Sequence, residues 1–257
     1  KHKMTSSQPP RTLQAAMEWC AIDPNPITAD YVAKLIQDAE QDTSDSMTEL
    51  SSLFPSDGGR ISFGTAGLRS TMKPGPLGMN DLVVLQAAQG IAKYALQQSK
   101  TTDKPPKAVI GYDHRTNPNL NISSLSFAIL TALVFQEAGI QPILLDSYVF
   151  TPLVPFVLQK TQAIVGIMVT ASHNPKQDNG YKVYASDGCQ IRSPMDSDIS
   201  KEIMANLVPW KDYGSALHEL QKKSTDDPCL GLSDPEMTKS MTSDYFAALK
   251  KHGLMTG

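Results

Sequence analysis

The sequence predicts an α/β fold: a mixed, mostly parallel sheet with helices on both faces, followed by the start of a second domain. Strand-like and helix-like segments alternate between residues 107 and 169, which indicates right-handed β-α-β connections. A length of 257 residues, with 40% hydrophobic and 19% charged residues, suits a globular chain with a substantial core. Polar residues directly follow two of the predicted strands, as ligand-binding residues do in open α/β sheets.

The N-terminal part of the sequence predicts a lead and two helices. We expect residues 1–20 to be a disordered or loosely packed lead. A helix should begin near Thr28, which can cap it, because apolar residues recur at helical spacing over residues 31–36. Residues 38–52 are polar. A longer helix with its apolar face on residues 82–96 follows the capping segment Met79-Asn-Asp81.

The alternation that defines the fold comes next. Thr151 is suited to cap one of its helices, because Pro152 then stands at the first helical position. A further extended segment covers residues 181–185. The predicted strands are residues 107–111, 141–145 and 164–169, and the predicted helices are residues 122–138 and 151–160.

The C-terminal part predicts a helix over residues 193–207, a polar irregular connection over 213–235 and a final helix over 240–252. We therefore expect one domain over residues 21–212. Residues 213–257 would be a connection and the first helix of a truncated second domain.

The composition indicates which classes of partner the protein could bind and in which compartment we expect it. The net charge of −3 argues against a general nucleic-acid or anionic-membrane surface, and it leaves room for a local basic pocket that binds a phosphorylated small molecule. Three widely spaced cysteines, without metal-ligand spacing, are typical of reduced thiols. The sequence shows no secretory leader and no apolar run of about 20 residues, so we expect a cytoplasmic protein.

The serine loop, residues 171–179, is the most informative segment. It joins two strand-like segments and carries Ser172 and His173, with Lys182 on the returning strand beyond Gly180, which we interpret as a hinge. A serine hydroxyl near a histidine and a lysine at a strand end suggests a site where the hydroxyl gains and loses a charged group. The alternative for Ser172 is a hydroxyl that only bonds its own turn.

Two further segments carry candidate residues. In Phe63-Gly-Thr-Ala-Gly-Leu-Arg69, the glycines would let the backbone approach a ligand, and the guanidinium of Arg69 could grip phosphate oxygens. Asp113, His114 and Arg115 end a predicted strand at the same sheet edge as Ser172. We interpret Asp113 and Arg115 as a structural ion pair and assign no catalytic role to these three residues.

These motifs resemble a known family. Thr170-Ala-Ser-His-Asn-Pro175, Asn179-Gly-Tyr-Lys182 and the segment ending at Arg69 are similar to the α-D-phosphohexomutase superfamily. The resemblance is strongest to its phosphoglucomutase/phosphopentomutase branch, which includes a glucose-1,6-bisphosphate synthase. It runs from about residue 17 to residue 210, with a weaker match at residues 244–246.

The resemblance implies a phosphosugar mutase, an isomerase that moves phosphate between the 1-position and the 5- or 6-position of a sugar through a bisphosphate. It implies that Ser172 is the phosphoserine, that Lys182 exchanges protons near the moving phosphate, and that Arg69 and His173 bind phosphate or substrate. For Lys182 and Arg69 the alternatives are a solvated edge lysine and a surface ion pair. For His173 the alternative is a neutral ring that pins the loop.

The resemblance also implies Mg²⁺, with an oxygen of the Ser172 phosphate as one ligand, and glucose 1,6-bisphosphate as activator or intermediate. Family members have four domains. We therefore expect this chain to be an N-terminal fragment, inactive alone, with the other metal ligands outside it. Two alternatives are a sugar-1,6-bisphosphate synthase and a non-catalytic phosphate-binding or interaction fragment.

Overall fold

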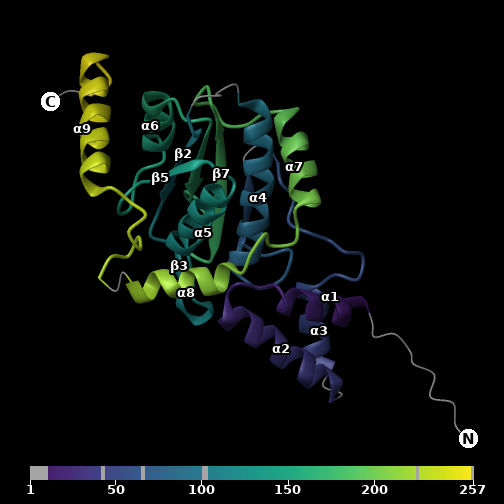
Figure 1. Ribbon diagram of the computed structural model, residues 1–257. Coiled ribbons are helices and arrows are strands. Elements are labelled where there is room, and N and C mark those ends of the chain that lie inside the picture. The colour runs from purple at the N-terminus through teal and green to yellow at the C-terminus, as the bar shows by residue number, and fades with distance from the viewer. Residues whose placement is uncertain (1–10, 42–43, 65–66, 100–103, 224–225, 256–257) are drawn as a thin grey trace, which may run out of the picture.

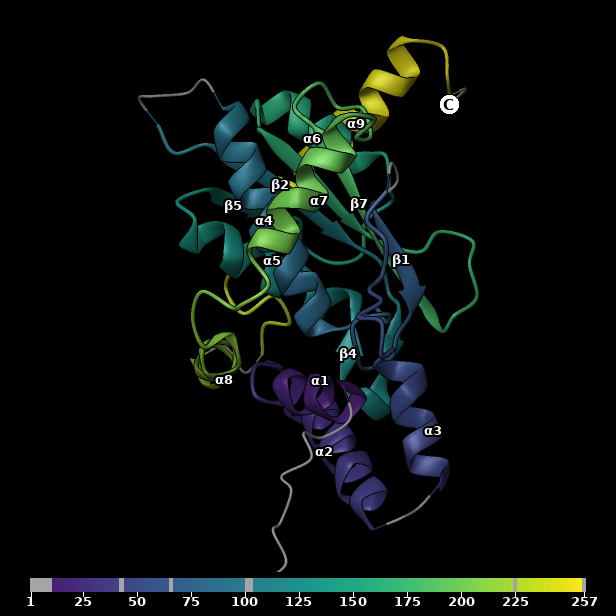
Figure 2. The same cartoon turned by 90° about the vertical axis from the view of Figure 1, so that its right-hand side faces the viewer.

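The computed structural model describes residues 11–41, 44–64, 67–99, 104–223 and 226–255. Its centre is a five-stranded sheet with the strand order β1-β7-β6-β2-β5 (Figures 1 and 2). The strands β5, β2 and β6 are parallel, whereas β7 is antiparallel to both β6 and β1. Four of the five strands therefore run in one direction, which confirms the mostly parallel sheet. The strands are β1 (Leu68–Thr71), β2 (Lys107–Tyr112), β5 (Gln141–Leu144), β6 (Val165–Val169) and β7 (Asp178–Ala185).

Helices cover both faces of this sheet (Figure 1). On one face α5 (Ser124–Glu137) packs against β2, β5 and β6, α4 (Asp81–Gln98) packs against α5, and α7 (Met195–Ala205) packs against α4. On the other face α6 (Leu153–Thr161) packs against β2 and β6, and α9 (Pro235–Lys251) contacts α6. Tyr184 of β7 is buried in the same apolar cluster as Val154 and Leu158 of α6, so the cover of this face reaches β7.

Local sequence explains why these elements form. The side chain of Asn80 caps α4 by accepting a hydrogen bond from the amide of Val83 at 3.0 Å, within the predicted capping segment. Ser123 and Ser126 form a capping box at the start of α5. Gly111 lets α6 lie close to the sheet, because a Cβ there would meet Val154 Cγ2 at 2.6 Å.

The N-terminal segment differs from the predicted loose lead. Residues 11–20 form the helix α1 (Arg11–Cys20), which packs with α2 (Pro26–Glu40) and α3 (Ser44–Leu53), as Figure 1 shows. The ring of Trp19 is buried and meets that of Phe54 edge to face, with the centroids 5.9 Å apart. The cause is tertiary, because the apolar side of a short polar helix finds partners some 35 residues later in the chain. The remainder of the predicted lead, residues 1–10, lies outside the described residues.

Several predicted boundaries were wrong. The cap of α2 is Asn25 rather than Thr28, and Thr28 instead donates to Asp23. The polar stretch 38–52 contains most of α3, which buries Leu50. Thr151 does not cap α6, which begins at Leu153 without a side-chain cap.

The C-terminal boundaries also differ. The segment 213–235, predicted to be irregular, contains α8 (Tyr213–Lys223), which contacts α5 and buries Tyr213. The last helix begins earlier than predicted because Asp234 caps it. Residues 122–123 pair as β4 (Ile122–Ser123) with β3 (Thr116–Asn117), next to the short helix η1 (Pro118–Leu120), before α5 begins. The division into a domain over 21–212 and a following segment stays a prediction.

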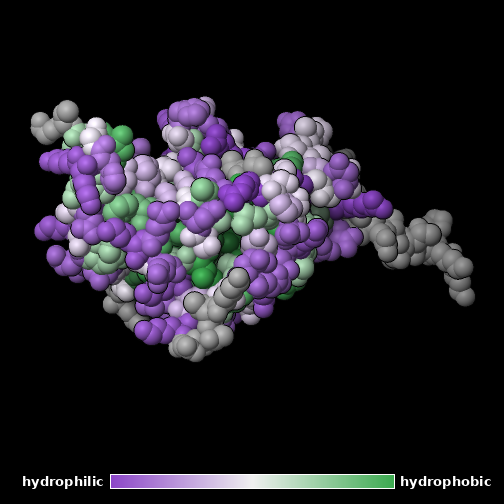
Figure 3. Space-filling view, turned by 90° about the horizontal axis from the view of Figure 1, so that it is seen from above, coloured by the Kyte–Doolittle hydropathy of each residue, from purple (hydrophilic) through white to green (hydrophobic). Residues whose placement is uncertain are grey.

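The surface of the protein is mostly hydrophilic, as expected for a folded chain whose apolar side chains are largely buried. In the view of Figure 3, hydrophilic residues cover most of the visible face and hydrophobic residues occupy separate areas between them. No helix in the described ranges has both the length and the apolar character that crossing a membrane requires.

Candidate active site at the serine loop

The serine loop leaves the carboxyl end of β6 and returns into β7, beside β1 (Figure 2). Ser172 and His173 are both exposed. Neither side chain makes a hydrogen bond within the described part of the chain. The hydroxyl predicted to carry phosphate is thus free to meet a ligand from solvent.

The backbone of Ser172 adopts a conformation that L-residues seldom use. Its φ of 57° is left-handed, which costs roughly 1–2 kcal/mol for a residue with a Cβ. The Ser172 amide donates to Thr170 Oγ1 at 2.9 Å, and Thr170 Oγ1 donates to Asp113 Oδ2 at 2.6 Å. Interactions with the residue that follows β2 therefore help to hold the turn at the serine.

Asp113 and Arg115 lie next to the serine loop, which confirms the prediction that both strand ends share one sheet edge. The Asp113 carboxylate accepts from Ser124 Oγ at 2.6 Å and from Arg115 Nε at 3.2 Å, in addition to Thr170. The Asp113 and Arg115 side chains are only 16% and 9% exposed. These contacts support the structural interpretation of the pair.

Arg69 and Lys182 are brought to one side of the sheet. Arg69 lies opposite Gly180 in the β1–β7 register, and Lys182 is two residues further along β7. The Arg69 guanidinium is exposed and donates to Asn174 Oδ1 in the serine loop at 3.1 Å. Lys182 is half-buried, and its pKa is lowered by burial and by the positive charge of Arg69, with Asp113 partly opposing the shift.

The glycines near these residues serve the sheet itself. A Cβ on Gly180 would meet the carbonyl oxygen of Thr170 at 2.6 Å, so this glycine allows close strand packing and is not a hinge. Gly67, with φ of 89°, lies close to the carbonyl oxygen of Tyr181, which a Cβ would meet at 1.9 Å. Gly64 has open space around its Cα, and residues 65–66 of the motif lie outside the described residues.

The donor set near Ser172 does not by itself fit a magnesium site. Mg²⁺ requires about six oxygen ligands in octahedral geometry. The carboxylate of Asp178 already accepts from Thr71 and from Asn174, each at 3.0 Å, and that of Asp113 is occupied as described. The described residues contain no group of three or more His, Cys, Asp or Glu side chains placed to hold a metal.

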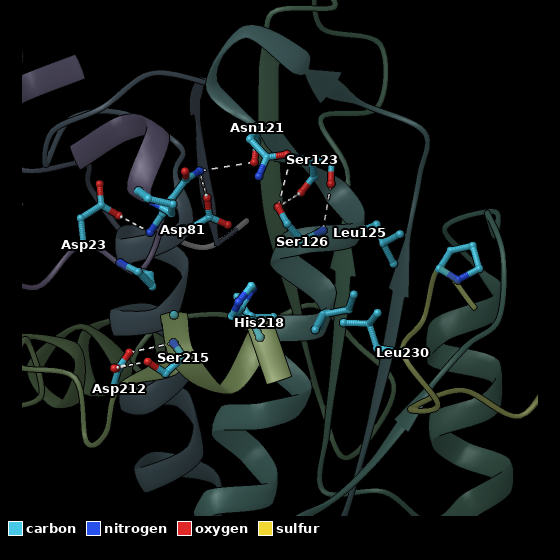
Figure 4. A pocket seen from close by; sticks show the side chains of 17 residues that line it. Asp23, Asp81, Asn121, Ser123, Leu125, Ser126, Asp212, Ser215, His218 and Leu230 are labelled. Carbon is cyan, nitrogen blue, oxygen red and sulfur yellow. Dashed lines mark hydrogen bonds between the residues drawn. The ribbon is translucent and has the colours of Figure 1, made fainter. Parts of the chain in front are cut away.

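A separate pocket of about 610 Å³ lies between α8 and the starts of α2, α4 and α5 (Figure 4). Figure 4 shows Asp81, at the start of α4, and His218, on α8, lining the same space. None of the predicted site residues lines it. The sequence analysis did not find this pocket, because its walls come from segments as far apart in the sequence as Asp23 and Leu230.

Comparisons with known proteins agree with this architecture. The family model described as phosphoglucomutase/phosphomannomutase, alpha/beta/alpha domain I, matches residues 60–207. A solved structure from Thermus thermophilus, provisionally assigned as a phosphomannomutase, aligns with a TM-score of 0.50 and 24% identity. The alignment covers 64% of this chain and 36% of that one, and it supports the fold.

Curated relatives extend the similarity. The phosphopentomutase of Homo sapiens is 40% identical over 93% of this chain and 36% of its own length. The phosphoribomutase of Saccharomyces cerevisiae is 44% identical over 80% of this chain and 31% of its own. The glucose 1,6-bisphosphate synthase of Homo sapiens is 39% identical over 78% and 31%. The chain spans about a third of the length of these relatives. With the family model matching more than half of it, the chain belongs to the phosphoglucomutase/phosphomannomutase family.

Proposed function

We propose that the chain supplies the phosphoserine domain of a phosphosugar mutase, which interconverts a sugar 1-phosphate and its 5- or 6-phosphate through a bisphosphate. The observation that carries the proposal is the setting of Ser172. Its exposed hydroxyl makes no hydrogen bond to the described residues, and its loop lies beside the two cations Arg69 and Lys182. The names of the relatives support the reaction class.

Each proposed step moves one phosphoryl group and one proton. In the first step, a hydroxyl oxygen of the sugar monophosphate forms a bond to the phosphorus carried by Ser172 while the bond from that phosphorus to Ser172 Oγ breaks, and the hydroxyl proton ends on Oγ; the product is a sugar bisphosphate. In the second step, Ser172 Oγ forms a bond to the other phosphorus of the bisphosphate while the bond from that phosphorus to its sugar oxygen breaks, and the serine proton ends on that oxygen. The second step releases the isomeric monophosphate and restores the phosphoserine. Such transfers depend mainly on positioning and charge stabilisation.

Arg69 and Lys182 have distinct proposed roles. The guanidinium of Arg69 presents several N–H groups to phosphate oxygens in a planar fork. Lys182 has a lowered pKa, so it releases its proton more readily than an ordinary lysine and can relay protons at the moving phosphate. The proposed role of His173, which is exposed in the same loop, is contact with the incoming phosphosugar.

Two small molecules belong to the proposal. Glucose 1,6-bisphosphate is the proposed activator or intermediate, supported by the relative named as its synthase. Mg²⁺ is proposed as the cation, with the Ser172 phosphate supplying one ligand. Because the carboxylates near Ser172 hold protein donors, its other ligands would come from residues that the structure does not describe or from a longer chain.

The test is phosphate transfer to the protein expressed from its complete reading frame. Incubation with glucose 1,6-bisphosphate should add one phosphate, located by peptide mass analysis at Ser172, and Ser172→Ala should abolish both labelling and turnover. Ser147→Ala is the matched control, because Ser147 is also exposed with a left-handed φ of 59°. Equal labelling of wild type and Ser172→Ala would contradict the proposal. The 257-residue chain alone should show no turnover.

A second candidate is a sugar-1,6-bisphosphate synthase that uses the same serine. The relative with that name favours it. The phosphate donor separates the two enzymes: 1,3-bisphosphoglycerate should label Ser172 faster in a synthase, and a sugar bisphosphate faster in a mutase. If neither donor labels Ser172 in the complete protein, a non-catalytic phosphate-binding module becomes the better description.

A further inference from the structure

The guanidinium of Arg115 is bound to the backbone of the serine loop. Nη1 donates to the carbonyl oxygens of Pro175 at 2.7 Å and Asp178 at 2.8 Å. Nη2 donates to the carbonyl oxygens of Ser172 at 2.8 Å and Asn174 at 3.0 Å. One side chain that follows the end of β2 therefore binds four carbonyls of a loop about 60 residues later in the chain.

These contacts leave Arg115 no free donor. A guanidinium has five N–H groups, and the fifth, on Nε, is bound by Asp113 Oδ2 at 3.2 Å. The side chain is 9% exposed. Arg69 is the opposite case, since it is exposed and makes one hydrogen bond to the described residues, with Asn174. Arg115 is thus unsuited to bind phosphate, whereas Arg69 remains available for it.

Hydrogen bonds connect both polar groups of the Ser172 backbone to the Asp113–Arg115 pair, the carbonyl directly and the amide through Thr170. The amide of Ser172 donates to Thr170 Oγ1, which donates to Asp113. The carbonyl oxygen of Ser172 accepts from Arg115, which is bound to Asp113 in turn. The four residues form a closed ring of hydrogen bonds around the left-handed serine.

We infer that Arg115 is a positioning residue for phosphoryl transfer, which holds Ser172 in the left-handed conformation that presents its hydroxyl to the phosphate. The inference rests on the proposed role of Ser172 as phosphoryl carrier. A flexible loop would spread the hydroxyl over many positions, and misplacement by about 1 Å can cost about 100-fold in rate. The closed ring fixes the peptide groups on both sides of the reacting side chain.

Arg115→Lys tests this inference, because lysine keeps the charge but offers three donors on one nitrogen and cannot reach four carbonyls. In the complete protein we expect kcat to fall about 100-fold, while KM for the phosphosugar stays nearly unchanged because Arg69 and Lys182 are intact. Hydrogen exchange of the amides at residues 172–174 and 176–178 should accelerate. Arg192→Lys is the matched control, since Arg192 forms an exposed ion pair with Asp187.

The possible outcomes separate the inference from the proposed function. Wild-type kcat and wild-type loop exchange in Arg115→Lys would overturn the inference, and so would a raised KM with unchanged kcat, which would make Arg115 a substrate ligand. If Arg115→Lys does not fold, Thr170→Val takes its place, because it removes only the link between Asp113 and the Ser172 amide. It should lower kcat about tenfold, and wild-type kcat would overturn the inference. If the wild type takes no phosphate, the proposed function fails, and the loop exchange still reports whether Arg115 holds the loop.

Discussion

Arg69 and Lys182 face the same side of the sheet, because Arg69 lies opposite Gly180 and Lys182 is two residues beyond it on β7. The strand pairing brings together two cations that are 113 positions apart in the sequence. Their proximity lowers the pKa of Lys182, in addition to the larger effect of burial. Like charges held on one face of the sheet are a cost to folding that a phosphate would relieve.

Lys182→Met should therefore leave the chain at least as stable as the wild type at pH 7. The native pKa of Lys182 is below that of the unfolded chain, so between the two values the unfolded state binds more protons and wild-type stability rises with pH. The advantage of Lys182→Met should consequently shrink as the pH is raised from neutral towards the ordinary lysine value of 10.5, as measured by urea midpoints. Lys201→Met, at an exposed ion pair, is the control. A variant that is less stable than wild type at pH 7 would contradict the unfavourable charge at Lys182.

The two glycines of the segment before Arg69 should respond differently to alanine. At Gly67 a Cβ would lie 1.9 Å from the carbonyl oxygen of Tyr181, and the φ of 89° is left-handed. The backbone alone should cost about 1–2 kcal/mol, and displacement of β1 from β7 should add to it. Gly64→Ala meets open space and should change the free energy of unfolding by less than about 0.5 kcal/mol. Equal losses in the two variants, by urea unfolding, would contradict the close packing of Gly67 on β7.

Ser172→Gly should be more stable than Ser172→Ala by about 1 kcal/mol. Glycine adopts the left-handed conformation without the steric cost of a Cβ, and its looser unfolded state offsets part of that gain. Ser172→Ala itself should stay within about 0.5 kcal/mol of wild type, since the hydroxyl makes no bond to the described residues. Thermal unfolding of the three proteins measures both differences. An alanine variant equal to or better than glycine would argue that Ser172 is not left-handed.

Asp81→Asn should flatten the dependence of stability on pH. Burial raises the pKa of Asp81 to about 7, and the nearby charge of Asp23 adds to the shift, while hydrogen bonds from Asn25 and Ser126 oppose it. The native state thus binds the proton more tightly than the unfolded state. The contribution of the Asp81 carboxyl to stability is therefore full below pH 3.8 and is lost as the pH rises towards 7.

Over that window, each rise of one pH unit should lower the free energy of unfolding of the wild type by up to about 1.4 kcal/mol relative to that of Asp81→Asn. Urea midpoints of both proteins, taken at intervals from mildly acidic to mildly alkaline pH, give the comparison. Asp212→Asn is the control, because exposed Asp212 lines the same pocket but has a lowered pKa and titrates below this range. Parallel profiles for wild type and Asp81→Asn would show that Asp81 does not titrate near neutral pH.

The sequence by itself determined the fold class, the family and the position of the serine loop. These depend on local signals: the alternation of apolar segments, the cap at Asn80, and short motifs whose order along the chain is specific. Even the shared edge of Asp113 and Ser172 followed from it, because the carboxyl ends of neighbouring parallel strands must meet.

Only the tertiary structure decided which side chains act on one another. The helix α1 is stabilised by Trp19 packing on Phe54, and α8 by burial of Tyr213, so neither helix is visible in a short polar stretch of sequence. The sequence alone suggests that Gly180 is a hinge. In the structure it is packed between the backbones of Leu68 in β1 and Thr170 at the end of β6. The bonds from Arg115 to the serine loop exist because β2 and β6 are neighbours in the sheet, and no local pattern encodes a hydrogen bond between segments 57 residues apart.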